Sequence, residues 1–266
     1  MKIYTIEGER MLLDRHGPGI GSELVKKGGR EFPYMLLLRQ ESKGFDLGID
    51  IGCNIGYTTI PLARNCKRVI AFEPDKRSRK LAQKNIDLNS LQNVELRSEA
   101  VSDTFGTTKF YMSNKPNQSS ITRKLGMKKR VETVCLNGLR GYLGKSVFVK
   151  MDIEGAEVKA LAGASSVLCD SSRCSVLVEL HTKQYSEKRN MRATVEVMKK
   201  MGFRIKYLVN AKGKLDKFIA RGHDPIKMFG DYPRAIFEPW GGCEDWCFTL
   251  DTDGKKFVRS ILLERV

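Results

Sequence analysis

The chain has 266 residues, of which 41% are hydrophobic and 29% are charged, so a disordered or fibrous protein is excluded. Apolar runs of about 18 residues and a basic-then-apolar leader are both missing, so we expect a cytoplasmic protein without a membrane span. Seven scattered cysteines indicate free thiols. The formal net charge of +16 is compatible with binding to nucleic acid, an anionic lipid surface or a phosphorylated substrate, and also with plain solubility or an acidic partner protein.

Residues 1–44 are predicted to form an N-terminal extension, and residues 45–266 the main domain. Apolar side chains between residues 3 and 13 indicate a short hairpin, and residues 32–38 should pack over the first strand of the main domain. The extension is interpreted either as a lid over a cofactor site or as a simple packing element.

Phe45–Asp75 has the pattern of a strand, a glycine turn, a helix and a second strand, which is the unit of a parallel sheet. Gly52 and Gly56 fall where the first strand must turn sharply into its helix. Glu73 ends the second strand, where a carboxylate accepts hydrogen bonds from a ribose diol. This pattern predicts a nucleotide-type cofactor.

The turn does not match a dinucleotide site, which has the pattern G-x-G-x-x-G. An acidic residue, Asp50, precedes the turn, and Cys53 and Asn54 occupy the place of the next glycine. The Asp50 carboxylate would repel a pyrophosphate but could hold a cationic amino-acid head, directly or through water. The turn therefore favours S-adenosylmethionine over NAD.

Residues 94–103 are predicted to form the third strand and its exit. Glu99 and Ala100 at its tip would border an adenine, although Glu99 is equally well explained as a solvated strand end. Residues 104–145 interrupt the alternation of strands and helices with two further strands, at 107–112 and 129–135, and we interpret them as a β insertion beside the site.

A strand at residues 147–151 leads into Asp152 and Glu154, and a helix is expected to follow through Leu168. Carboxylates at this strand end could orient an acceptor, accept its proton or bind a metal. Glu157 is interpreted only as a negative charge that favours the helix N-terminus.

The next strand, from residue 175, ends in Glu179 and His181, which alternation puts on the same side of the sheet. With Asp152 on a neighbouring strand, these side chains should converge. His181 could act as a general base or, with Asp152 and Glu179, as a divalent-metal ligand, but no metal is assigned.

The rest of the chain should complete the sheet. We expect a helix at 192–201, strands at 203–209, 245–250 and 257–263, and a basic loop at 210–244.

Five motifs together resemble the FkbM-type S-adenosylmethionine-dependent methyltransferases. They are Asp50-Ile-Gly-Cys-Asn-Ile-Gly56, Phe72-Glu73-Pro74, Ala100-Val-Ser-Asp103, Lys150-Met-Asp152-Ile-Glu-Gly-Ala-Glu157 and Glu179-Leu-His181. The resemblance implies an α/β class I methyltransferase (Rossmann-like) fold. Its seven-stranded, mostly parallel sheet carries helices on both faces, here with the β insertion and the N-terminal extension added. It also implies methylation of a hydroxyl, often on a sugar or other small-molecule or glycan acceptor.

The residues expected to bind the cofactor are Asp50, Gly52, Cys53, Asn54, Gly56, Glu73, Pro74, Glu99, Ala100 and Asp152. The residues expected to be catalytic are Asp152, Glu154, Glu179 and His181. Cys53 stands where the family commonly has alanine.

Two alternatives stay open. The positive charge, together with Lys150 and Asp152, is compatible with a ribose 2′-O-methyltransferase that acts on RNA. A non-catalytic binding module of the same fold is the other alternative. The sequence leaves the oligomeric state open.

Overall fold

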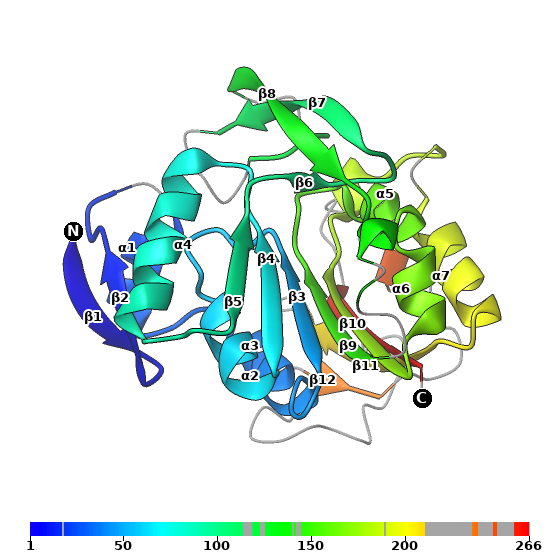
Figure 1. The fold of residues 1–266 in the computed structure, drawn as a ribbon, viewed down its shortest axis with the longest axis horizontal. Coiled ribbons are helices and arrows are strands. Elements are labelled where there is room, and N and C mark those ends of the chain that lie inside the picture. The colour runs from blue at the N-terminus through cyan, green and yellow to red at the C-terminus, as the bar shows by residue number, and fades with distance from the viewer. Residues whose placement is uncertain are drawn as a thin grey trace, which may run out of the picture.

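A computed structural model describes residues 1–17, 19–113, 119–122, 126–139, 141, 145–188, 190–210, 236–238, 247–248 and 258–265. A central sheet lies between two layers of helices, with smaller β elements at its edges (Figure 1). None of the described helices is long and apolar enough to cross a membrane.

The described part of the chain forms an eight-stranded central sheet in the order β12-β11-β13-β10-β9-β3-β4-β5. Its strands are β3 (Leu47–Ile51), β4 (Arg68–Phe72), β5 (Val94–Arg97), β9 (Ser146–Met151), β10 (Arg173–Glu179), β11 (Arg204–Asn210), β12 (Ile236–Phe237) and β13 (Val258–Arg265). From β5 to β10 all neighbours are parallel, whereas β13 runs antiparallel to both β10 and β11. The predicted fold class is confirmed, and β12 adds a two-residue edge strand to the seven expected.

Alternating side chains of the inner strands feed two hydrophobic cores, one on each face of the sheet. On β9, Val147 and Val149 belong to one core and Phe148 to the other. The first core is covered by α5 (Glu157–Ala162), α6 (Ser165–Asp170) and α7 (Met191–Lys200). The second core is covered by α2 (Phe32–Glu41), α3 (Thr59–Asn65) and α4 (Lys76–Leu88).

The N-terminal segment forms a hairpin of β1 (Lys2–Ile6) and β2 (Glu9–Leu13), followed by α1 (Ile20–Lys27) and then α2. Two buried asparagines of α4 attach this hairpin to the domain. The Asn85 side chain accepts the Leu12 N–H at 2.7 Å, and the Asn89 side chain donates to the Arg10 carbonyl at 2.7 Å.

Two strands of the segment predicted as a β insertion, β7 and β8, form a three-stranded sheet with β6, which lies just before that segment, in the order β6-β8-β7. It consists of β6 (Ala100–Val101), β7 (Gly106–Met112) and β8 (Met127–Val134), and short 3-10 turns follow at Leu136–Gly138 and later at Thr182–Gln184. The Ser120 hydroxyl donates to the Glu154 carbonyl at 3.0 Å, which ties this part of the chain to the carboxyl end of β9.

Two predictions of secondary structure were wrong. The single helix expected from residue 157 is two helices, α5 and α6. Gly163 ends the first of them, at a point where the backbone passes so close to the Ser102 carbonyl that a Cβ would lie 2.3 Å from its oxygen. In the predicted strand 245–250, Cys247 and Phe248 are helical, and its other residues lie outside the described part of the chain, as does most of the basic loop 210–244.

Candidate active site

A pocket opens at the carboxyl ends of the parallel strands, where side chains of different strands meet. Its lining combines the glycine turn, the end of β4, the β insertion and the strand ends that carry carboxylates. Among the predicted residues, the pocket is lined by Gly52, Cys53, Asn54, Glu73, Pro74, Glu99, Ala100, Asp152, Glu154 and Glu179. Asp50, Gly56 and His181 lie outside this lining.

The glycine turn requires glycine at both predicted positions. Gly52 has φ +80°, and a Cβ there would lie 2.1 Å from the Asp152 carbonyl oxygen. Gly56 has φ +86° and packs against Ala82 of α4, so that a Cβ added at Gly56 would lie 3.5 Å from the Cα of Ala82. Between them, Asn54 also has a positive φ of 52°. The turn therefore passes close under the pocket floor, without side chains that would fill it.

Glu73 is held in place by the turn itself. One carboxylate oxygen accepts the Asn54 N–H at 2.9 Å and the other accepts the Asp75 N–H at 2.8 Å. Burial raises the pKa of Glu73 to about 7 despite these hydrogen bonds. Both oxygens keep lone pairs for a ligand in the pocket.

Asp50 is fully buried beneath the turn instead of reaching into the pocket. Its carboxylate lies 3.0 Å from Lys150 Nζ and accepts hydrogen bonds from the hydroxyls of Thr58 at 2.9 Å and Thr59 at 2.7 Å. Lys150 also donates to the Gly52 carbonyl at 2.8 Å. Asp50 thus stabilises the turn through Lys150, and direct contact with a ligand would require these bonds to rearrange.

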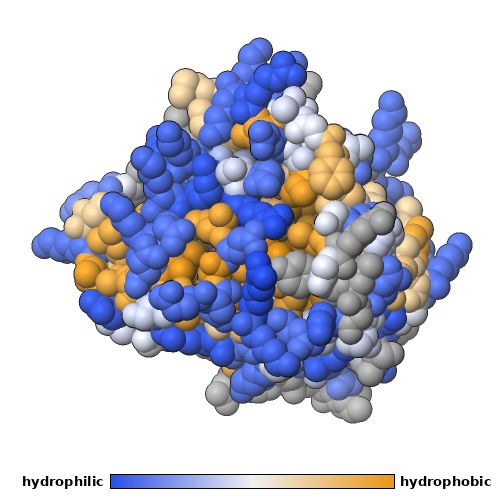
Figure 2. Space-filling model, viewed as in Figure 1, coloured by the Kyte–Doolittle hydropathy of each residue, from blue (hydrophilic) through white to orange (hydrophobic). Residues whose placement is uncertain are grey.

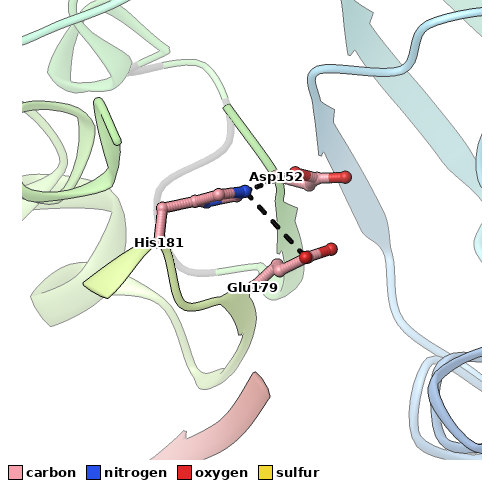
Figure 3. A group of neighbouring side chains, drawn as sticks. All are labelled: Asp152, Glu179 and His181. Carbon is pink, nitrogen blue, oxygen red and sulfur yellow. Dashed lines mark ion pairs between the residues drawn. The ribbon is translucent and has the colours of Figure 1, made fainter. Parts of the chain in front are cut away.

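The predicted convergence of acidic groups around His181 is present (Figure 3). His181 Nε2 lies 3.6 Å from Asp152, 3.8 Å from Glu154 and 3.9 Å from Glu179. The imidazole is mostly buried, with 12% of its side chain exposed, so it stands behind the carboxylates that face the pocket.

Glu157 has a larger role than the helix-terminal one predicted from the sequence. It is the first residue of α5, but its side chain is fully buried. One of its oxygens lies 2.8 Å from His181 Nδ1 and also accepts the Gly155 N–H at 3.1 Å. Glu157 therefore orients the His181 ring and directs Nε2 toward Asp152.

The pKa values of Asp152 and His181 are both raised in this environment. Burial and the negative charge of Glu179 raise the pKa of Asp152 to about 7, against the opposing effect of Lys150. Burial disfavours protonated His181, but the Glu157 carboxylate outweighs it and raises the pKa of His181 to about 9. At neutral pH His181 is a cation and Asp152 can exchange its proton.

Asp152, Glu179 and His181 also offer ligand atoms within 4.8 Å of one another, a spacing that could hold a metal ion. The His181–Glu157 hydrogen bond is the kind of support that metal-binding histidines have. However, the Arg259 guanidinium already lies 3.2 Å from Glu179. Two arrangements therefore fit these three residues. In one, all three bind a divalent cation; in the other, a protonated His181 itself balances the charge of Asp152 and Glu179, and no metal ion is needed.

One part of the pocket wall and one residue that supports it were missed from the sequence. Arg30, Glu31 and Tyr34 of the N-terminal extension line the pocket. Arg259 of β13 forms ion pairs with Glu31 and with Glu179. Neither segment carries a motif, and only the fold brings residues so far apart in sequence together.

A family model described as the methyltransferase FkbM domain matches residues 50–205, more than half of the chain. A curated relative, the tRNA/tmRNA (uracil-C(5))-methyltransferase of Pseudoalteromonas atlantica, is 30% identical over 95 residues. The match covers 36% of this chain and 24% of that protein, so the chain spans about a quarter of the relative's length.

Among solved structures, a methyltransferase FkbM from Methylobacillus flagellatus KT is 14% identical with a TM-score of 0.41, over 67% of this chain and 54% of that one. An rRNA methylase from Streptococcus thermophilus is 10% identical with a TM-score of 0.42, over 87% of this chain and 93% of that one. Both TM-scores are below 0.5, so the assignment rests on the domain match. The chain belongs to the FkbM methyltransferase family.

Proposed function

We propose that this protein transfers the methyl group of S-adenosylmethionine to a hydroxyl of a sugar or other small-molecule or glycan acceptor. The observation that carries the proposal is Asp152, a pocket-lining carboxylate with a raised pKa beside the glycine turn. The family match supports methyl transfer, and the pocket chemistry supports oxygen as the methylated atom.

The cofactor would lie along the carboxyl ends of the strands. Glu99 and Ala100 would border the adenine, and Glu73 would accept the ribose hydroxyls. The methionine part would follow the turn at Gly52 and Asn54, with the sulfonium near Asp152. Cys53, Gly56 and Pro74 would shape this channel, and Asp50 would support it from below.

Methylation of a hydroxyl requires loss of its proton as the new C–O bond forms. Asp152 is suited to accept this proton because its pKa is about 7. His181 is a cation at this pH and stands behind the pocket, so it would stabilise ionised Asp152 instead of acting as the base. Glu154 and Glu179 line the pocket and would accept hydrogen bonds from further acceptor hydroxyls.

The charge around the site favours a neutral, hydroxyl-rich acceptor. Asp152, Glu154 and Glu179 all face the pocket, and a phosphate placed beside them would be repelled. Sugar hydroxyls instead donate to carboxylates, which makes a carbohydrate the better fit.

The test is methyl transfer from radiolabelled S-adenosylmethionine to a panel of glycosides. We expect Asp152→Asn to lower turnover at least about 100-fold while the affinity for S-adenosylhomocysteine stays within about threefold. Asp170→Asn, a change at an exposed carboxylate, is the matched control. Full activity of Asp152→Asn would exclude this residue as the base.

The same assay separates proton acceptance by Asp152 from metal catalysis. We expect activity to survive EDTA, because Arg259 and His181 supply the positive charge around the carboxylates. Loss of activity with EDTA and its return with a divalent cation would instead support a metal bound by Asp152, Glu179 and His181.

A second candidate function, methylation of RNA, is favoured by a basic surface. It consists of exposed cations on α4, β7 and β8, namely Lys76, Arg77, Lys80, Lys84, Lys109, Lys128 and Arg130. Within the part of the chain that the structure describes, none of them forms an ion pair. Figure 2 shows hydrophilic residues covering α4 on this side of the molecule.

Two further cations on the elements that carry this basic surface contact the pocket wall. The carbonyl of Pro74, a pocket residue, accepts hydrogen bonds from Arg79 of α4 at 3.3 Å and Lys129 of β8 at 3.2 Å. On the hairpin, Lys109 lies directly opposite Arg130, a like-charge pair that an anion would stabilise. The tRNA/tmRNA-methylating relative is compatible with this alternative.

RNA binding is tested by fluorescence anisotropy with a labelled single-stranded RNA over a range of salt concentrations. If RNA is the acceptor, reversing Lys80, Lys109 and Arg130 to glutamate should weaken binding and flatten its salt dependence. The control reverses three exposed lysines on other elements, Lys26, Lys43 and Lys200. Equal effects of both triple variants would mean that net charge alone is responsible. Cofactor binding without methyl transfer to any glycoside or RNA would instead support the alternative of a non-catalytic binding module.

A further inference from the structure

The loop before α2 contributes Arg30 and Glu31 to one wall of the pocket, and contacts on two sides hold these residues in place. On one side, the Tyr57 hydroxyl accepts the Arg30 N–H at 3.0 Å and lies 3.0 Å from a Glu7 carboxylate oxygen. On the other side, Glu31 forms an ion pair with Arg259, which in turn pairs with Glu179. This wall is therefore attached to both the glycine turn, through Tyr57, and the central sheet, through Arg259, and it can position a side chain against a ligand.

Tyr34 is the side chain that this wall presents without a partner. It lies in the first turn of α2, is 2% exposed and lines the pocket. Among the residues that the structure describes, its hydroxyl has no hydrogen-bond partner. A buried hydroxyl without a partner costs stability, so such a group facing a pocket is best explained by a ligand atom that completes it.

The surroundings of Tyr34 identify the kind of ligand atom. Burial and the nearby carboxylates, Asp152 first and Glu179 next, keep the pKa of Tyr34 well above its usual value, so the hydroxyl stays protonated. It can therefore donate a hydrogen bond but finds no described acceptor. The missing partner is an acceptor, and a negatively charged one forms the strongest hydrogen bond.

The position of Tyr34 in the pocket narrows the choice further. Glu99, Ala100 and Phe110 line the pocket on the side of the β insertion, whereas Tyr34 lies near Asp152 and Asp50, on the side of the glycine turn. If the adenosine lies on the side of the β insertion, the amino-acid end of the cofactor reaches the side of the glycine turn, where Tyr34 lies. Its ammonium group finds carboxylates there, but its carboxylate needs a donor.

We propose that the Tyr34 hydroxyl binds the α-carboxylate of the methionine part of S-adenosylmethionine, so that the N-terminal extension completes the cofactor site. Arg30 lines the same wall but already forms ion pairs with Glu31 at 2.5 Å and Glu23 at 3.7 Å, so the Tyr34 hydroxyl is the donor on which this proposal depends. This inference rests on the proposed function, because it assumes S-adenosylmethionine in the pocket. It assigns the extension a binding role in addition to packing.

The test compares two ligands that differ only in this carboxylate, S-adenosylhomocysteine and its decarboxylated analogue, which keeps the ammonium group. Each is titrated calorimetrically into the wild type, Tyr34→Phe and the control Tyr4→Phe, a change at a half-buried tyrosine of β1. We expect Tyr34→Phe to weaken S-adenosylhomocysteine about tenfold or more and the analogue less than about twofold. Tyr4→Phe should change neither.

The ligand-free protein gives a second readout. Because the hydroxyl has no partner, Tyr34→Phe should leave the Tm unchanged or raise it, whereas removal of a hydrogen-bonded tyrosine hydroxyl would lower it. Unchanged affinity for S-adenosylhomocysteine, or an equal loss for both ligands, would overturn the inference and leave the proposed function intact. Failure of the wild type to bind S-adenosylhomocysteine at all would refute both.

Discussion

Replacement of Glu157 by glutamine removes one buried negative charge while keeping the size of the side chain. The glutamine oxygen can still accept the Gly155 N–H, which Glu157 accepts at 3.1 Å. What is lost is the charge that lies 2.8 Å from His181 Nδ1. The substitution therefore isolates the ion pair from the packing around it.

The size of the effect follows from the pKa of His181. A rise from 6.5 to about 9 corresponds to about 3 kcal/mol of net stability, in which the attraction of the carboxylates exceeds the cost of burying the charged ring. Glu157 is the nearest of them, and we assign about 2 kcal/mol to it. Because the folded-state pKa is raised, this stability is fully present below pH 6.5 and is lost as the pH rises through 9.

Urea unfolding of the wild type and Glu157→Gln at a series of pH values measures this contribution. The difference in unfolding free energy should be largest at pH 6 to 6.5 and should shrink toward zero above about pH 9. Glu187→Gln, at an exposed carboxylate, should show no such trend. A difference that stays constant with pH would refute the ion pair and assign the loss to packing.

Further substitutions test the turn and the ribose site. In urea unfolding, Gly52→Ala should destabilise the protein by more than about 2 kcal/mol, because its Cβ would overlap the Asp152 carbonyl. The control is Gly44→Ala, at a glycine with a similar φ of 77° and open space around it, which should cost about 1 kcal/mol. Equal losses would contradict the close approach. Glu73→Gln should weaken S-adenosylhomocysteine at least about tenfold. Because the pKa of Glu73 is raised to about 7, the wild type should lose stability as the pH rises from 4.5 to 7, and Glu73→Gln should not show this loss. If the variant loses stability in the same way, other groups cause the decline.

Several features of this protein could be predicted from local sequence. Apolar runs that end in acidic residues marked β3, β4, β9 and β10, and parallel strands place such ends at one edge of the sheet. This is why the neighbourhood of Asp152, Glu179 and His181 was predictable before any coordinates. The glycine turn was predictable as well, because a strand that turns so abruptly into a helix needs positive φ.

Contacts between distant segments could not be predicted in this way. Asp50 faces Lys150 because β3 and β9 pair in that register, and a single strand pattern does not give the register of its neighbour. Tyr34 lines the pocket from near the start of the chain, and Arg259, near its end, pairs with the pocket residues Glu31 and Glu179. Glu157 resembles an ordinary helix-terminal acid in the sequence, and its burial against His181 depends on how α5 packs.

Calorimetric titration with S-adenosylmethionine and S-adenosylhomocysteine, beside NAD, tests the central claim most directly. The turn at Gly52 and the carboxylate of Glu73 predict micromolar binding of the first two ligands. They predict no binding of NAD, because Asn54 stands where the second glycine of the dinucleotide pattern would admit the pyrophosphate. Binding of NAD instead, or of none of the three, would contradict the assignment of this pocket to S-adenosylmethionine.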